Sequence, residues 1–224
     1  MKLSKLAYQC VKNAIYYDDP SFTYEQFLMG KHDSNPDYAN NIRNVFGPIN
    51  AAVMRLGDLE RIPYRVDKVD LEEGFFPKSD LSKACRSVVA VATMKDGAPY
   101  PLSFKDFGDK VLVERASGGA VLVEYKEDIP PFNTESYTYD YVLNDLGGYS
   151  LYGTPSDIEL KDYGITDAMC WAIVEYVKGS LNEQVDSQLA NMHMNRAEQY
   201  FSNIEPAKSA LRQQTIKTAY KMGE

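Results

Sequence analysis

The sequence predicts an α+β protein: a helical bundle built from N- and C-terminal helices, with an inserted small antiparallel β-sheet and an extended C-terminal tail. Three observations favour this fold class. Apolar residues recur at three- and four-residue steps near both ends of the chain, which is the spacing of amphipathic helices. Between these regions the apolar pattern alternates and is rich in β-branched residues, as in strands. No helix-length pattern separates the strand candidates, which favours an antiparallel sheet over a βαβ array.

These patterns predict three parts of the chain. Residues 1–62 and 164–204 form the helical bundle, whose two terminal pairs of helices each need the other to bury a wide apolar face. Residues 63–163 form the β-rich insertion, which includes a Tyr-rich loop over 133–163. Residues 205–224 form the C-terminal tail.

The N-terminal part predicts two long helices and a short helical turn. The first helix carries an apolar stripe over residues 3–15 and ends before Pro20, because proline cannot continue the hydrogen-bond ladder. The short turn covers 23–29, and the second long helix covers 36–56. Gly47-Pro48 interrupts this second helix, so we expect it to be bent there.

Five segments of the insertion are strand candidates. Lys95-Asp96-Gly97 predicts a turn after the most β-branched of them. Ser117-Gly118-Gly119 predicts a hairpin between the fourth and fifth candidates. The five candidates are residues 64–71, 86–94, 100–104, 110–115 and 120–126.

Two helices and a basic tail are predicted at the C-terminal end. The first covers 165–177, with Thr166 or Asp167 as its N-cap, and is apolar on nearly every face, so we expect it to be the most buried helix. The second covers 185–204 and ends at Pro206. The tail 205–224 carries a net charge of +2, which leaves −10 on the other 204 residues.

The connection 133–163 is unusually long and unusual in composition. It holds six tyrosines, and six acidic residues against one lysine. A connection of this length in a compact domain is either functional or a flexible surface insertion. The sequence leaves both interpretations open.

Charge and cysteine content exclude several classes of protein. Lys and Arg number 24 against 32 Asp and Glu, and this acidic balance disfavours general binding to nucleic acid or an anionic membrane. Cys10, Cys85 and Cys170 lie too far apart for a zinc knuckle and are odd in number for a secreted disulfide framework. With no apolar stretch long enough to cross a bilayer, the sequence predicts a soluble protein of a reducing compartment.

No motif supports an enzyme, a metal or a cofactor. Dinucleotide, P-loop and serine-hydrolase motifs are absent, and neither His32 nor His193 has a carboxylate or cysteine at metal-ligand spacing. We therefore expect no catalytic residues, no metal and no cofactor. One alternative stays open, in which the four acidic residues gather Mg²⁺ in a metal-dependent hydrolase or nuclease; these are Asp67, Asp70, Glu72 and Glu73.

The order of elements and several stretches of sequence resemble the head–tail connector proteins (adaptor or head-completion proteins) of tailed bacteriophages. The C-terminal half carries most of the resemblance. The stretches concerned are the apolar helix 165–177, the polar turn 180–183, the helix ending at 196–201, the strand 119–125 that leads to Pro130-Pro131, and the helix-to-strand passage 56–66. Another structural protein of the phage neck or tail-completion machinery is the alternative within the same class.

The resemblance implies a non-enzymatic virion protein at the head–tail junction, present in the host cytoplasm during assembly. About twelve copies form a ring beneath the portal protein, extend the channel through which DNA passes, and bind a tail protein or second adaptor, with no membrane involved. It implies a docking role for the tail toward the portal or a neighbouring copy, at Lys208, Arg212, Lys217, Tyr220 and Lys221. It also suggests tail or subunit contacts by the loop, at Tyr137, Tyr139, Tyr141, Tyr149 and Tyr152.

Overall fold

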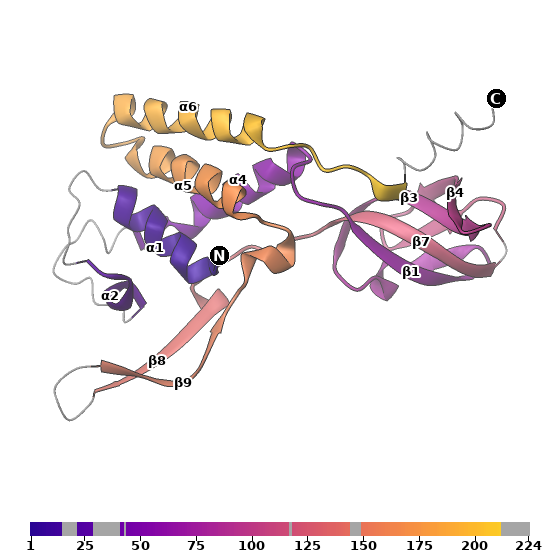
Figure 1. Ribbon diagram of the computed structural model, residues 1–224, viewed down its shortest axis with the longest axis horizontal. Helices are drawn as coiled ribbons and strands as arrows, with labels where there is room; N and C mark the ends of the chain where they lie inside the picture. Colours follow the sequence, from indigo (N-terminus) through magenta and orange to yellow (C-terminus); the bar gives the residue numbers. More distant parts are fainter. Residues whose placement is uncertain (15–21, 29–40, 43, 117, 144–148, 212–224) are drawn as a thin grey trace. The chain divides into compact units, whose positions relative to one another are not determined.

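The computed structural model describes residues 1–14, 22–28, 41–42, 44–116, 118–143 and 149–211. The chain divides into two compact units (Figure 1). One comprises Met1–Arg61 and Pro131–Glu205, and the other comprises Ile62–Pro130 and Pro206–Glu224. The chain therefore passes from one unit to the other at three places.

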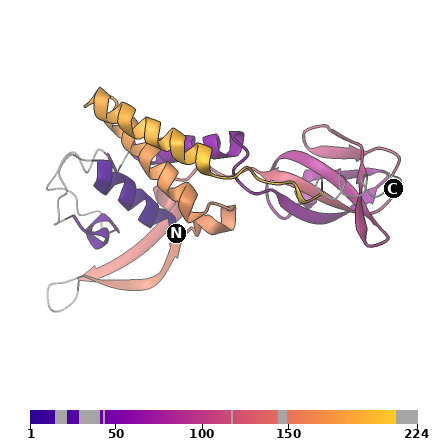
Figure 2. The same cartoon turned by 45° about the horizontal axis from the view of Figure 1, so that its top comes forward.

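The first unit is built around a central helix, α5. This helix packs against α1, α4 and α6 (Figure 2), so the prediction of a central helix at this position is confirmed. Thr166 caps it, because the hydroxyl accepts a hydrogen bond from the amide of Met169. The helices of this unit are α1 (Leu3–Ala14), α2 (Tyr24–Leu28), α4 (Phe46–Asp58), α5 (Asp167–Asn182) and α6 (Ser187–Asn203).

The interruption expected at Gly47-Pro48 lies just before these residues: the described chain is helical at 41–42 and at 44, has a turn at Val45, and is helical again from Phe46. Helix α4 begins at Phe46, so both residues lie in its first turn. Proline is tolerated there because the first amides of a helix have no carbonyl partner within it. The apolar stripe continues across this helix start, which is why the sequence pattern did not locate it.

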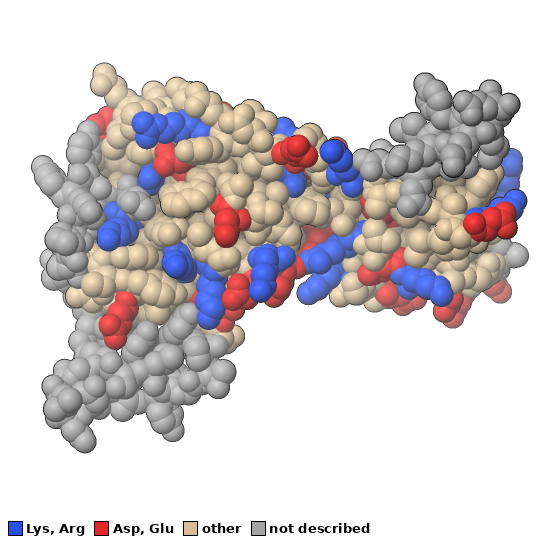
Figure 3. Space-filling model, viewed as in Figure 1, with Lys and Arg blue, Asp and Glu red and all other residues tan. Residues whose placement is uncertain are grey.

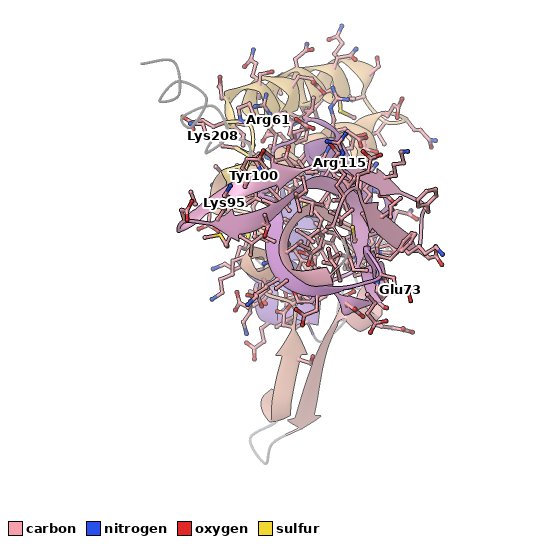
Figure 4. The ribbon with its side chains drawn as sticks, turned by 90° about the vertical axis from the view of Figure 1, so that its right-hand side faces the viewer. Arg61, Glu73, Lys95, Tyr100, Arg115 and Lys208 are labelled. Carbon is pink, nitrogen blue, oxygen red and sulfur yellow. The ribbon has the colours of Figure 1, made fainter. Side chains whose placement is uncertain are left out.

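The second unit is a seven-stranded antiparallel sheet that curves into a nearly closed barrel (Figure 4). The predicted architecture, a helical bundle with a small inserted sheet, is therefore wrong. The strand order is β4-β3-β7-β1-β2-β6-β5. The strands are β1 (Arg65–Glu72), β2 (Phe75–Pro77), β3 (Cys85–Lys95), β4 (Ala98–Leu102), β5 (Phe104–Asp106), β6 (Lys110–Val113) and β7 (Gly118–Glu127).

The two edge strands of this sheet are consecutive in sequence, and this closes the barrel. Only Ser103 separates β4 from β5, and its carbonyl accepts the amide of Glu114 at 2.8 Å. The carboxylate of Asp106 on β5 accepts the backbone amide of Val88 on β3 and pairs with Lys78 at 2.9 Å. Strands of three residues carry no periodicity, so β2 could not be predicted and the full extent of the sheet was missed.

The barrel encloses its own apolar core. Val123 and Tyr125 of β7 are fully buried there with Phe76 of β2. The hydroxyl of Tyr125 donates to Asp67 at 2.8 Å. Burial alone would raise the pKa of Asp67, but hydrogen bonds from Ser82 and Tyr125 hold that pKa below its usual value.

One predicted hairpin is confirmed and one is wrong. Strands β3 and β4 pair around Asp96-Gly97, as the Lys95-Asp96-Gly97 signal predicts. Strands β6 and β7 do not pair across Ser117-Gly118-Gly119: β6 pairs with β2 and β5, whereas β7 pairs with β1 and β3. Gly118 and Gly119 are the first two residues of β7, whereas β6 ends earlier, at Val113, in a different part of the sheet.

The long connection contains a second sheet, which the sequence did not predict. Strands β8 (Tyr137–Leu143) and β9 (Tyr149–Asp157) form an antiparallel hairpin between the short 3₁₀ helices η2 (Thr134–Ser136) and η3 (Leu160–Tyr163). This region belongs to the helical unit. Its base is tied to α1, because Ser4 donates its amide and its hydroxyl to the carboxylate of Asp157.

We predict that Gly74→Ala destabilises the barrel more than Gly97→Ala does. Both glycines have positive φ, +83° and +79°, which costs an alanine about 1 kcal/mol. A Cβ at Gly74 would also lie 2.6 Å from the carbonyl oxygen of Ala116, whereas nothing lies within 4 Å at Gly97. Urea unfolding should show a loss of about 3 kcal/mol for Gly74→Ala. Equal losses for the two variants would show that the close approach to Ala116 has no energetic effect.

Candidate assembly interface

The β8–β9 hairpin is a two-stranded sheet separate from the barrel. Its register pairs Tyr141 with Leu151 and Leu143 with Tyr149, with a bulge between Thr138 and Asp140. Among the described residues, no further strand pairs with either side of it. In the part of the chain that the structure describes, β8 and β9 thus pair only with each other.

The hairpin holds all five tyrosines predicted to make contacts. Tyr137, Tyr139 and Tyr141 lie in β8, and Tyr149 and Tyr152 lie in β9. The sequence indicated an interaction segment from its tyrosine content but missed the hairpin. The signal that could have found it is Gly147-Gly148 between two segments rich in tyrosine and leucine.

The predicted tail residues lie largely outside the described part of the chain. Lys208 is described and exposed, in the extended segment that follows α6 (Figure 4). Arg212, Lys217, Tyr220 and Lys221 lie outside the described residues. The structure thus gives a position to one of the five residues predicted to dock this tail.

The acidic residues considered as a magnesium site are not brought together. On β1, Asp67 points to the barrel interior, where it binds Ser82 and Tyr125, while Asp70 and Glu72 are exposed. Successive residues of a strand point to opposite faces, so the spacing from Asp67 to Asp70 separates their carboxylates. Within the described residues, no group of three or more His, Cys, Asp or Glu could hold a metal ion.

A buried ionic cluster links α5 and α6. Glu175 pairs through one carboxylate oxygen with His193 at 2.7 Å and through the other with Lys178 at 2.9 Å. Burial alone would raise the pKa of Glu175, but the hydrogen bonds from His193 and Lys178 outweigh it and hold this pKa below its usual value. The cluster is internally satisfied, so it fixes helix packing. His32, the other histidine, lies outside the described residues.

Two of the three cysteines are packed in the helical core. Cys10 on α1 and Cys170 on α5 are buried, and all three cysteines are free. Burial raises the pKa of the Cys10 thiol strongly and that of Cys170 to about 11. Both therefore remain protonated thiols at neutral pH and act as packing residues.

Acidic and basic residues are distributed unevenly along the sequence. The described residues do not form one broad basic surface. Residues 131–205 contain twelve acidic residues against three basic ones. On the face that Figure 3 shows, blue and red side chains are interspersed among uncharged surface. None of the described helices is long and apolar enough to cross a membrane.

No protein-family model matches this chain, and no curated protein has a significantly similar sequence. A function for the chain is therefore inferred from its own residues and their geometry.

We predict that Glu175→Gln lowers the free energy of unfolding at pH 7 by about 2 kcal/mol, because it removes the charge that His193 and Lys178 share. The folded-state pKa of Glu175 is depressed, so its stabilisation is complete above the unfolded pKa of about 4.3 and is lost as pH falls through the lower folded value. The difference in unfolding free energy between the variant and the parent should therefore become smaller as the pH falls. Glu183→Gln, at an exposed position, is the control and should change little. If the difference in unfolding free energy between Glu175→Gln and the parent stayed constant from pH 7 to pH 3, it would contradict a depressed folded-state pKa of Glu175.

Proposed function

We propose that this protein is a structural subunit that assembles into a ring, and that the ring is a head–tail connector bound beneath a phage portal. The observation that carries the proposal is the β8–β9 hairpin, with its two unpaired edges and its tyrosine-rich sequence.

A two-stranded sheet is marginally stable on its own in water. Natural proteins protect exposed strand edges with lysines, prolines or a covering element. Residues 137–157 contain no Lys or Arg, and their one proline is Pro155, near the end of β9. A neighbouring copy that adds a strand to this hairpin would extend the two-stranded sheet and stabilise it.

The helical unit offers a second contact residue. Trp171, the only tryptophan of the chain, is 51% exposed near the start of α5. Tryptophan is enriched among residues that dominate binding at protein interfaces. An exposed tryptophan on the central helix suits a subunit whose surface is covered by another copy on assembly.

The charge distribution supports a channel protein. The excess of acidic residues over 131–205 repels the phosphates of DNA, so a ring lined by such a surface lets DNA pass without binding it. The basic C-terminal sequence has the opposite charge and is available for docking on another protein of the assembly.

We predict that a chain with a shortened hairpin folds but does not form rings. Residues 139–155 are replaced by Asn-Gly, which closes the Thr138–Ser156 pair with a two-residue turn and keeps the Asp157 contact with Ser4. The melting temperature should stay within a few degrees of the parent, while ring particles disappear from negative-stain images. Insertion of Gly-Ser between Gly147 and Gly148 keeps both strands and is the control, which should still form rings. Rings of normal size from the shortened chain would contradict the proposal.

We also predict that deletion of 212–224 weakens docking on the portal protein of the same phage by at least tenfold. The deletion removes Arg212, Lys217 and Lys221 but retains Ser209 and Ala210, which bind the barrel. Docking is measured by co-sedimentation of the chain with portal rings, and circular dichroism checks the fold. Unchanged docking would show that these basic residues have no part in it.

A further inference from the structure

The β8–β9 hairpin is bound at both of its ends by helices of its own unit. Its entry root, residues 131–133, leads into β8, and its exit root, residues 157–160, follows from β9. Each root has a polar side-chain contact with a different helix. These contacts bear on the two interpretations that the sequence leaves open for residues 133–163, a functional element or a flexible insertion.

The entry root is bound by a side chain of α4. Asn50 donates its Nδ2 to the carbonyl of Phe132 at 2.9 Å, and its Oδ1 accepts the amide of Phe132 at 2.8 Å. Two hydrogen bonds to the same residue fix the direction of its backbone as well as its position, as they do between paired strands. Phe132 is only 2% exposed, so water has little access to compete for these bonds.

The exit root is bound by the first turn of α1. Asp157 accepts the amide of Ser4 at 3.2 Å through one carboxylate oxygen and the hydroxyl of Ser4 at 2.5 Å through the other. The amide of Leu3 donates to the carbonyl of Ile158 at 2.9 Å. The first amides of a helix have no carbonyl partner within it, and a negative charge is favourable beside them. The exit root thus caps α1 while α1 holds the exit root.

The two roots are also tied to each other and to α2. The ring of Phe132 packs edge-on against the ring of Tyr163 in η3, with centroids 5.8 Å apart and planes at 80°. The hydroxyl of Tyr24 on α2 lies 2.5 Å from the hydroxyl of Ser4, which is fully buried. Both ends of the hairpin are therefore fixed to packed elements of the helical unit.

A hairpin with fixed ends has an advantage over a mobile loop when it binds. A mobile segment must be ordered at the moment of binding, and the lost conformational entropy weakens the association. Contacts that fix the direction of the segment beforehand remove part of that cost.

We propose that Asn50 and Ser4 are positioning residues that hold the β8–β9 hairpin as a preformed arm in the free chain. This proposal favours a functional element over a flexible insertion for residues 133–163. The fixed direction of the arm is independent of what it binds, and only its use in ring formation rests on the proposed function.

The test measures the direction of the arm in the free chain by electron paramagnetic resonance. Spin labels are attached through Ser150→Cys in β9 and Gln199→Cys in α6, in a chain that also carries Cys85→Ser. Cys10 and Cys170 are buried, so they do not take up label. The parent should give a narrow distribution of label-to-label distances, and a distribution as broad as that of the root variants below would overturn the proposal.

The root variants remove the contacts one at a time and together. Asn50→Ala frees the entry root and Ser4→Ala weakens the exit root, so each should broaden the distance distribution. The two changes combined should broaden it by about twofold. Asn191→Ala and Ser187→Ala, at exposed positions of α6, are the matched controls and should leave the width unchanged. Unchanged widths for both root variants would overturn the assignment.

Two further variants guard against misfolding. Circular dichroism checks every labelled chain, and Asn50→Leu or Asp157→Asn, which keep the size of the side chain, replaces a root variant that does not fold. Negative-stain images of the unlabelled chains keep the two proposals apart. A narrow distribution in a parent that forms no rings refutes the ring and leaves the arm standing, because the width is measured on the free chain. Rings from a parent whose distribution is broad refute the arm alone.

Discussion

The constraint on which this structure depends is that strand edges must find partners for their backbone groups. The barrel meets it in large part within the chain: five of its seven strands have neighbours on both sides, and at the edge strand β5 the side chain of Asp106 accepts the amide of Val88 on β3. The β8–β9 hairpin does not meet it among the described residues. The two sheets thus differ in how many of their strands have neighbours within the described chain, and the proposed assembly offers the hairpin a partner.

Each of the two units also contains a buried carboxylate, and the two carboxylates differ in where their partners lie. In the helical unit, Glu175 is satisfied by His193 and Lys178, two side chains fixed on packed helices. In the barrel, Glu124 is satisfied by Ser209 and Ala210, which lie on a segment attached through an extended stretch. The first arrangement is structural and permanent. The second joins the barrel to a segment that lies more than eighty residues further along the same chain.

The sequence predicted the elements with strong periodicity and missed those set by long-range pairing. The stripe of α1, the Thr166 cap and buried faces of α5, and the Asp96-Gly97 turn were all readable from local pattern. The closed barrel was not, because β2 and β5 have three residues each and their partners are fixed by the curvature of the whole sheet. The tyrosine-rich segment was recognised as unusual, yet its hairpin was missed: β8 does alternate, with tyrosines at 137, 139 and 141, but Gly153 and Pro155 interrupt the pattern of β9. Glu124 gave no signal at all, since its partners are 85 and 86 residues away.

The three passages of the chain between the two units have a mechanical consequence. Cleavage after Arg61 or after Pro130 leaves the barrel joined to the helices through the remaining connections, and cleavage after Glu205 frees only a segment that Glu124 still holds. A protease must therefore cut more than once before the barrel is released. In a virion subunit of the kind proposed, an isolated nick would leave the barrel covalently attached to at least one segment of the helical unit.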